Sequence, residues 1–189
     1  MKSRTIYRIA LGAMFVVTIF IAIGIVLTFN LAREMDEPVS FWDVSFPLIG
    51  LIVTPFVGMV YYIKKKPLGW IFCCGYAIFL LVLLSLYYFD LSQMEGASME
   101  GMGGMTASFI VMSAVLVSLI VLLLTDKMRA LFFRGGQDKL LDTFAMAFVV
   151  AITIGLIVFT PRLVALSHHM VWIFVIVFAA LRSVVNKYK

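Results

Sequence analysis

Four methionines cluster in one polar segment of the chain, and their thioethers suit a specific chemistry. Met94, Met99, Met102 and Met105 fall within twelve residues, in a stretch that reads MEGASMEGMGGM. Thioethers are soft ligands that favour Cu(I), and they need no deprotonation to bind it. The pattern therefore indicates a candidate copper site. The alternative is a glycine-rich connector whose methionines bind no metal or pack against a partner as soft apolar groups.

The only two histidines are the second set of candidate ligands. We expect His168 and His169 on the same side of a membrane as the methionines, where they would add imidazole nitrogens to a copper site. Adjacent residues of a helix point about 100° apart, so the pair cannot readily share one haem or quinone. The two histidines therefore extend the copper hypothesis and give little support to a haem site.

Small residues recur every four positions in two apolar segments. Such stripes let helix backbones approach closely in lipid. Pro55, inside the first stripe, predicts a kink, because its missing N–H leaves a carbonyl without a helical partner. We expect these stripes to pack within the protein, and a docking face for another subunit is the alternative. The stripes are Gly50, Thr54 and Gly58 in one segment and Ala147, Ala151 and Gly155 in the other.

Charged residues are missing from the middle of every long apolar segment. Ionisable groups inside a membrane usually mark proton relays, ion paths or voltage sensors. Their absence argues against a proton-coupled pump, although carbonyls, hydroxyls and apolar gates can line a passive pore.

Cys73 and Cys74 are the only cysteines, and we expect both to be small buried packing residues. Because no paired catalytic groups fall in the apolar segments, we expect no enzymatic activity.

The composition requires an apolar solvent around the folded chain. Hydrophobic residues make up 63% of the 189 residues and charged residues 13%, whereas soluble domains carry about 25% charged residues. A helix that crosses a bilayer takes roughly 20 apolar residues. The sequence therefore predicts an all-α polytopic membrane protein, a single bundle of six transmembrane helices over residues 1–189. The expected spans are 9–29, 44–63, 68–89, 107–125, 143–160 and 163–181.

Two starting points are open for the sixth span. A helix from Leu163 would place both histidines more than one turn inside it. A helix capped by Ser167 would keep only Met170–Val185 and leave 163–166 in the outer interface. We expect the longer helix, and we expect polar connectors at Asp90–Thr106 and Asp126–Asp142.

Lysine and arginine predict the orientation, because they are retained on the cytoplasmic side of a membrane. With the N-terminus inside, the outer segments hold only Arg33 and Arg162. Both termini are then cytoplasmic, in the inner membrane of a bacterial-type cell. The net charge of +5 indicates contact with anionic lipid headgroups rather than nucleic acid. The thirteen cytoplasmic basic residues are Lys2, Arg4, Arg8, Lys64, Lys65, Lys66, Lys127, Arg129, Arg134, Lys139, Arg182, Lys187 and Lys189.

These observations favour a non-enzymatic accessory or structural subunit of a membrane complex. Its partners would be lipid and either other membrane subunits or further copies of the chain. The alternative is a small transporter or pore that handles Cu(I) through the methionine segment. Apolar spans with packing stripes support the first hypothesis, and the methionine cluster supports the second.

Overall fold

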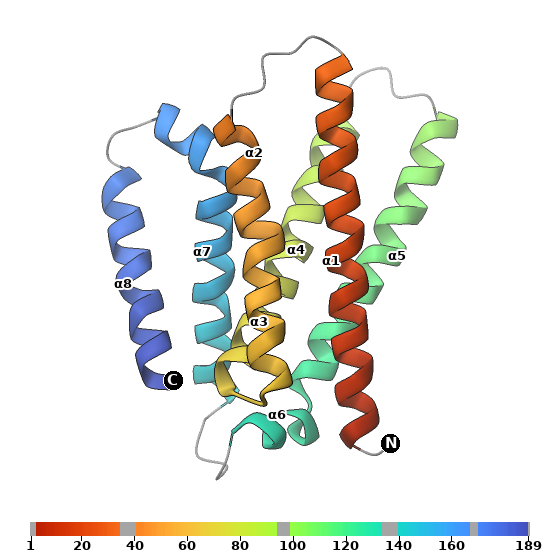
Figure 1. Ribbon diagram of the computed structural model, residues 1–189. Coiled ribbons are helices and arrows are strands. Elements are labelled where there is room, and N and C mark those ends of the chain that lie inside the picture. Colours follow the sequence, from red (N-terminus) through yellow and green to blue (C-terminus); the bar gives the residue numbers. More distant parts are fainter. Residues whose placement is uncertain (1–2, 35–40, 94–98, 134–139, 167–169, 189) are drawn as a thin grey trace.

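The computed structural model describes residues 3–34, 41–93, 99–133, 140–166 and 170–188, and every element in these ranges is a helix (Figure 1). The expected all-α fold class is confirmed. The long helices run alternately in opposite directions along one bundle (Figure 1). The elements are α1 (Ser3–Glu34), α2 (Phe41–Leu48), a π-helix η1 (Ile49–Val53), α3 (Thr54–Ile63), α4 (Pro67–Gln93), α5 (Met99–Leu124), α6 (Asp126–Phe132), α7 (Leu140–Leu166) and α8 (Met170–Tyr188).

One end of the bundle gathers the basic segments. Helix α1 begins there and α8 ends there, and the same end holds the α3–α4 turn and the short helix α6 (Figure 1). The turn carries three exposed lysines, Lys64–Lys66, and α6 carries the exposed Lys127. We call this the basic end and the opposite one the far end. Basic residues that are separated in sequence therefore lie on one side of the molecule.

Four helical stretches in the described residues are long and apolar enough to cross a membrane. They lie in α1, along the continuous α2–η1–α3 path, in α4 and in α7, close to four of the six expected spans. A fifth is present if Phe109–Leu124 and α6, which differ in direction by 63°, count as one bent span. The four stretches are Thr5–Leu27, Ser45–Ile63, Pro67–Phe89 and Asp142–Phe159.

The sixth helix does not begin where we expected. Helix α7 continues through Leu163 to Leu166, and α8 begins at Met170, so the expected start at Leu163 is wrong. Ser167, the cap in the alternative, lies outside the described residues. Pro161 and Arg162 lie within α7. A proline removes one hydrogen bond but need not end a helix when neighbouring groups compensate. In the described part of α8 the apolar stretch Val175–Asn186 falls below the length of a crossing.

The two expected polar connectors are also shorter than the sequence indicated. Helix α4 extends to Gln93 and α5 begins at Met99, which leaves residues 94–98 between them. In the second connector, Asp126–Phe132 forms α6. Its buried Met128 and Phe132 face the bundle, whereas Lys127 and Ala130 are exposed. Helix α6 is therefore an amphipathic helix that covers part of the basic end.

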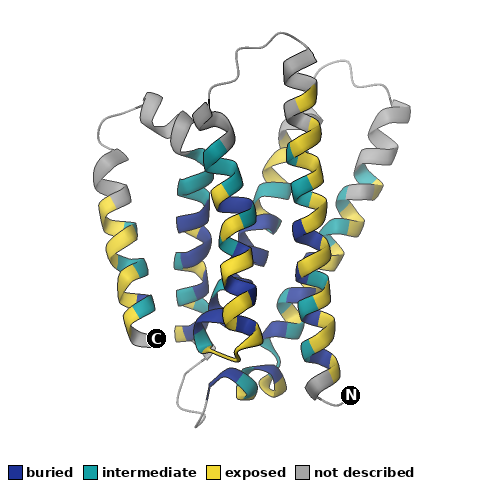
Figure 2. Ribbon diagram, in the orientation of Figure 1, coloured by how far each residue is buried: buried dark blue, intermediate teal, exposed yellow. Residues whose placement is uncertain are grey.

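Helix α4 is the core of the fold. From Leu68 to Leu80 every residue is buried except the half-buried Phe72, because α3, α5 and α7 all pack against this helix. Its apolar residues therefore surround the helix axis instead of forming one stripe. Figure 2 shows the buried residues at the centre and the exposed ones on the outer faces. Large apolar side chains such as Phe20 on α1 (63% exposed) and Ile176 on α8 (66% exposed) point outward, as lipid-facing residues do.

Candidate functional site

A buried hydrogen bond joins α4 to the π-helix near the middle of the bundle. The Tyr76 hydroxyl donates to the carbonyl oxygen of Leu51 at 2.8 Å. In an α-helix the N–H of residue 55 would bond to this carbonyl, but Pro55 has no N–H. Thr18 on α1 places its hydroxyl beside the Tyr76 phenol oxygen and donates to the carbonyl of Met14 at 2.8 Å. The junction therefore supplies the hydrogen bond that the proline removes.

The π-helix lies directly before Pro55. Thr54 donates both its backbone N–H and its hydroxyl to the carbonyl of Ile49, the hydroxyl at 3.0 Å. A single wide turn of this kind adds a residue to the helix without ending it. The chain therefore contains a π-turn at Ile49–Val53, close to the kink expected at Pro55.

At the basic end, Trp70 holds the bend between α5 and α6. Its indole N–H donates to the carbonyl of Leu123 at 2.8 Å, and its ring meets the edge of Phe133 at a centroid distance of 5.5 Å. Leu123 lies in the last turn of α5, where carbonyls lack helical donors. The indole therefore satisfies a carbonyl at the point where the chain turns by 63°.

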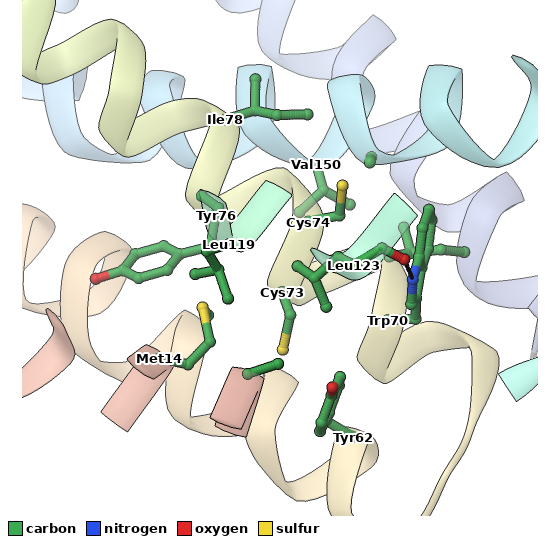
Figure 3. Close-up of a cluster of buried hydrophobic side chains, with 14 of the residues drawn as sticks. Met14, Tyr62, Trp70, Cys73, Cys74, Tyr76, Ile78, Leu119, Leu123 and Val150 are labelled. Carbon is green, nitrogen blue, oxygen red and sulfur yellow. Dashed lines mark hydrogen bonds between the residues drawn. The ribbon is translucent and has the colours of Figure 1, made fainter. Parts of the chain in front are cut away.

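Three aromatic rings close the basic end between α1, α3 and α6. Tyr7 stacks on Tyr62 at 5.0 Å, and Tyr62 lies 4.7 Å from Phe132. The Tyr7 hydroxyl donates to the Tyr62 carbonyl at 3.3 Å. The buried Tyr62 hydroxyl has no hydrogen-bond partner among the described residues. Cys73 points toward Tyr62 in Figure 3. Both it and Cys74, further along α4, are buried free thiols, as we expected.

The first small-residue stripe packs inside the bundle. A Cβ added at Gly50 would lie 2.5 Å from Val158 Cγ2 on α7, and one at Gly58 would lie 3.0 Å from Phe72 Cβ on α4. Thr54, between them, is half-buried. The stripe therefore brings the α2–η1–α3 path close to α7 near the far end and to α4 near the basic end.

The second stripe faces α4. Ala147 and Ala151 are buried, and a Cβ at Gly155 would lie 3.4 Å from the ring of Phe79. A closer contact between α4 and α7 comes from Gly75, which the sequence pattern missed: its added Cβ would lie 2.5 Å from the Ala147 carbonyl oxygen. Both stripes are thus occupied by neighbouring helices, which favours packing within the bundle over a docking face.

An apolar cleft of about 600 Å³ lies between α1, α2, α4 and α5, one turn closer to the far end than the Tyr76 junction. Helix α1 contributes Val17 to Ile25, α2 contributes Pro47, and α4 contributes Leu80 to Tyr87. Met112 and Leu116 of α5 complete the lining. The Tyr87 hydroxyl and the Met112 thioether are the polar groups among these side chains. A cavity of this size and composition is typical of a binding site for an apolar molecule.

The candidate copper ligands divide into two groups. Met99, Met102 and Met105 fall in the first turns of α5, so this part of the methionine segment is helical rather than a connector. Met94, His168 and His169 lie outside the described residues. The copper site therefore stays a prediction.

Comparison of the chain with protein-family models, curated proteins and solved structures finds no match. The functional argument for this protein therefore depends on its own residues.

Proposed function

We propose that the protein is a non-enzymatic integral membrane protein that serves as an accessory or structural subunit of a membrane complex. In this proposal the chain crosses the membrane six times. We assign four crossings to the four long apolar stretches and the fifth to α5, the longer member of the bent α5–α6 pair. Helix α8 has 19 residues and extends about 28 Å at 1.5 Å per residue. The apolar stretch Val175–Asn186 alone is shorter than a crossing. The whole helix is close to the roughly 30 Å of a bilayer's hydrocarbon core, and on that ground we assign it the sixth crossing.

The basic end faces the cytoplasm in this proposal. Both ends of the chain, the exposed Lys64–Lys66 turn and α6 lie together there (Figure 1). Lysine and arginine are retained on the cytoplasmic side during insertion. Helix α6, with buried Met128 and exposed Lys127, has the character of a helix that lies along anionic headgroups.

The subunit role is supported by one observation: polar side chains inside the bundle form hydrogen bonds between helices. Trp70, Tyr76 and Tyr7 each donate to a backbone carbonyl of another helical element. These groups join helix to helix, so they support a fixed scaffold. Helix α8, by contrast, packs mainly on α7 and turns exposed apolar residues outward. Such an edge is suited to contact with another membrane subunit.

Mild-detergent purification from native membranes tests this proposal. Photo-crosslinking residues at Ile176 on α8 and at Phe20 on α1 sample two different exposed faces. We expect a partner chain in constant stoichiometry, crosslinked from at least one face. A self-assembled ring of this chain alone, or copper retained through purification, would contradict the subunit role and favour the transporter or pore.

A further inference from the structure

The cleft between α1, α2, α4 and α5 combines a large volume with an almost entirely hydrocarbon lining. Its volume of about 600 Å³ is about four times that of the roughly 150 Å³ cavity that holds one benzene molecule. The wall formed by α4 and α5 is fixed beyond the cleft, because Tyr88 stacks on Phe109 at 4.3 Å. The Tyr88 hydroxyl also lies 3.2 Å from that of Thr106. The cleft therefore has a defined wall.

Gly24 on α1 keeps the cleft open. A Cβ added there would meet nothing within 4 Å, whereas Gly50, Gly58 and Gly75 lie against neighbouring helices. Glycine inside a helix costs about 1 kcal/mol relative to alanine. At the other three positions close helix packing offsets this cost. At Gly24 the missing side chain instead leaves room inside the cleft.

The lining and the length of the cleft favour a hydrocarbon chain. Its α1 wall from Val17 to Ile25 is about 12 Å long at 1.5 Å per residue. Apart from the Tyr87 hydroxyl and the Met112 thioether, the lining side chains offer only hydrocarbon. An extended acyl chain can lie along such a wall without leaving a polar group unpaired.

We propose that this cleft binds an acyl chain of a phospholipid from the leaflet at the far end of the bundle. The inference assumes the membrane location proposed above. The lining runs from Val17 near mid-bundle to Tyr87 close to the far end, which is the path of a lipid tail from headgroup to mid-bilayer. Tyr87 has a phenol that can meet the interface, where tyrosine is favoured. Burial of each methylene against the half-buried Ile21, Ile25 and Leu84 supplies the binding energy.

Photolabelling in vesicles tests this proposal. The purified full chain is reconstituted into phosphatidylcholine whose acyl chains carry a diazirine, and labelled residues are mapped by mass spectrometry. Leu80 and Leu116 line the cleft and are only 6% and 2% exposed, so a lipid tail reaches them only by entering it. Leu68, 4% exposed and outside the cleft, is the matched buried control. We expect label at Leu80 and Leu116 and none above background at Leu68.

Two glycine variants complete the test. Gly24→Phe fills the cleft, and excluding two or more methylenes should lower labelling at Leu80 and Leu116 roughly tenfold. Gly12→Phe, on the same helix and also with nothing within 4 Å of its added Cβ, should leave labelling unchanged. Exposed Ile152 on α7 reports insertion in every variant. If Ile152 is labelled but Leu80 and Leu116 are not, the acyl-chain site is overturned and the membrane location stands. Equal labelling of Leu80 and Leu116 in the two glycine variants has the same meaning. A crosslink from the cleft to a second polypeptide also overturns it, and absence of label at Ile152 contradicts the membrane location itself.

Discussion

The hydroxyl of Tyr76 on α4 lies 2.8 Å from the carbonyl oxygen of Leu51, the carbonyl that the N–H of residue 55 would reach in an α-helix if that residue were not proline. An unsatisfied buried carbonyl costs about 1–3 kcal/mol. The bond therefore compensates for the proline and also ties the π-helix to the core helix.

Tyr76→Phe should destabilise the protein by about 1–3 kcal/mol, because the Leu51 carbonyl then loses its donor in an apolar environment. Chemical unfolding in mixed detergent micelles measures the change. Pro55→Ala supplies the matched background, since the alanine N–H can bond to Leu51 itself. In that background Tyr76→Phe should cost clearly less. An equal loss of stability in both backgrounds would show that the Tyr76 hydrogen bond does not compensate for Pro55.

Gly75→Ala should destabilise the bundle by about 1–3 kcal/mol through overpacking. The added Cβ would lie 2.5 Å from the Ala147 carbonyl oxygen and 2.8 Å from Val150 Cβ, and backbone atoms cannot move aside cheaply. Gly12→Ala is the control: its Cβ meets nothing within 4 Å, and alanine favours a helix over glycine by up to about 1 kcal/mol. The same unfolding assay compares them. If Gly75→Ala is as stable as Gly12→Ala, α4 and α7 do not pack as closely as described.

Hydropathy predicted the helices whose sequences are apolar along their full length. The spans in α1, α4 and α7 follow directly from continuous apolar runs. That Pro55 removes a backbone donor was also predictable from the sequence, whereas the π-turn ahead of it was not. Nor was the hydrogen bond from Tyr76 to the Leu51 carbonyl, since the two residues meet only through the packing of α4 on η1.

Other features could not be derived from one-dimensional patterns. The search for repeats at intervals of four passed over Gly75. A lone glycine in an apolar helix does not by itself indicate close packing, because Gly12 and Gly24 in α1 would meet nothing within 4 Å of an added Cβ. Pro161 lies inside α7, which therefore runs on to Leu166 and past the expected start of the sixth span at Leu163. The cleft depends on how far α1 stands from α5, and no residue spacing encodes that distance.

The copper hypothesis makes a separate prediction. Purified protein should bind Cu(I) with an affinity that varies little with pH, because thioethers have no proton to lose. Changing Met94, Met99, Met102 and Met105 together to Leu should abolish binding, and changing His168 and His169 to Asn should weaken it only if the two segments meet. Titration against a Cu(I) chelator is the measurement. Failure of the wild-type protein to compete, or equal binding by the four-Leu variant, would remove the copper site.

The central claim is that the chain crosses the membrane six times with its basic end in the cytoplasm, and cysteine labelling in intact cells tests it most directly. The native Cys73 and Cys74 are buried, so they give little background. Gln93→Cys, at the end of α4, should react with an impermeant reagent from outside. Lys127→Cys on α6 and Asn186→Cys at the end of α8 should react only after the membrane is permeabilised. Labelling of Lys127→Cys in intact cells would contradict the orientation, and labelling of Asn186→Cys alone would show that α8 does not cross.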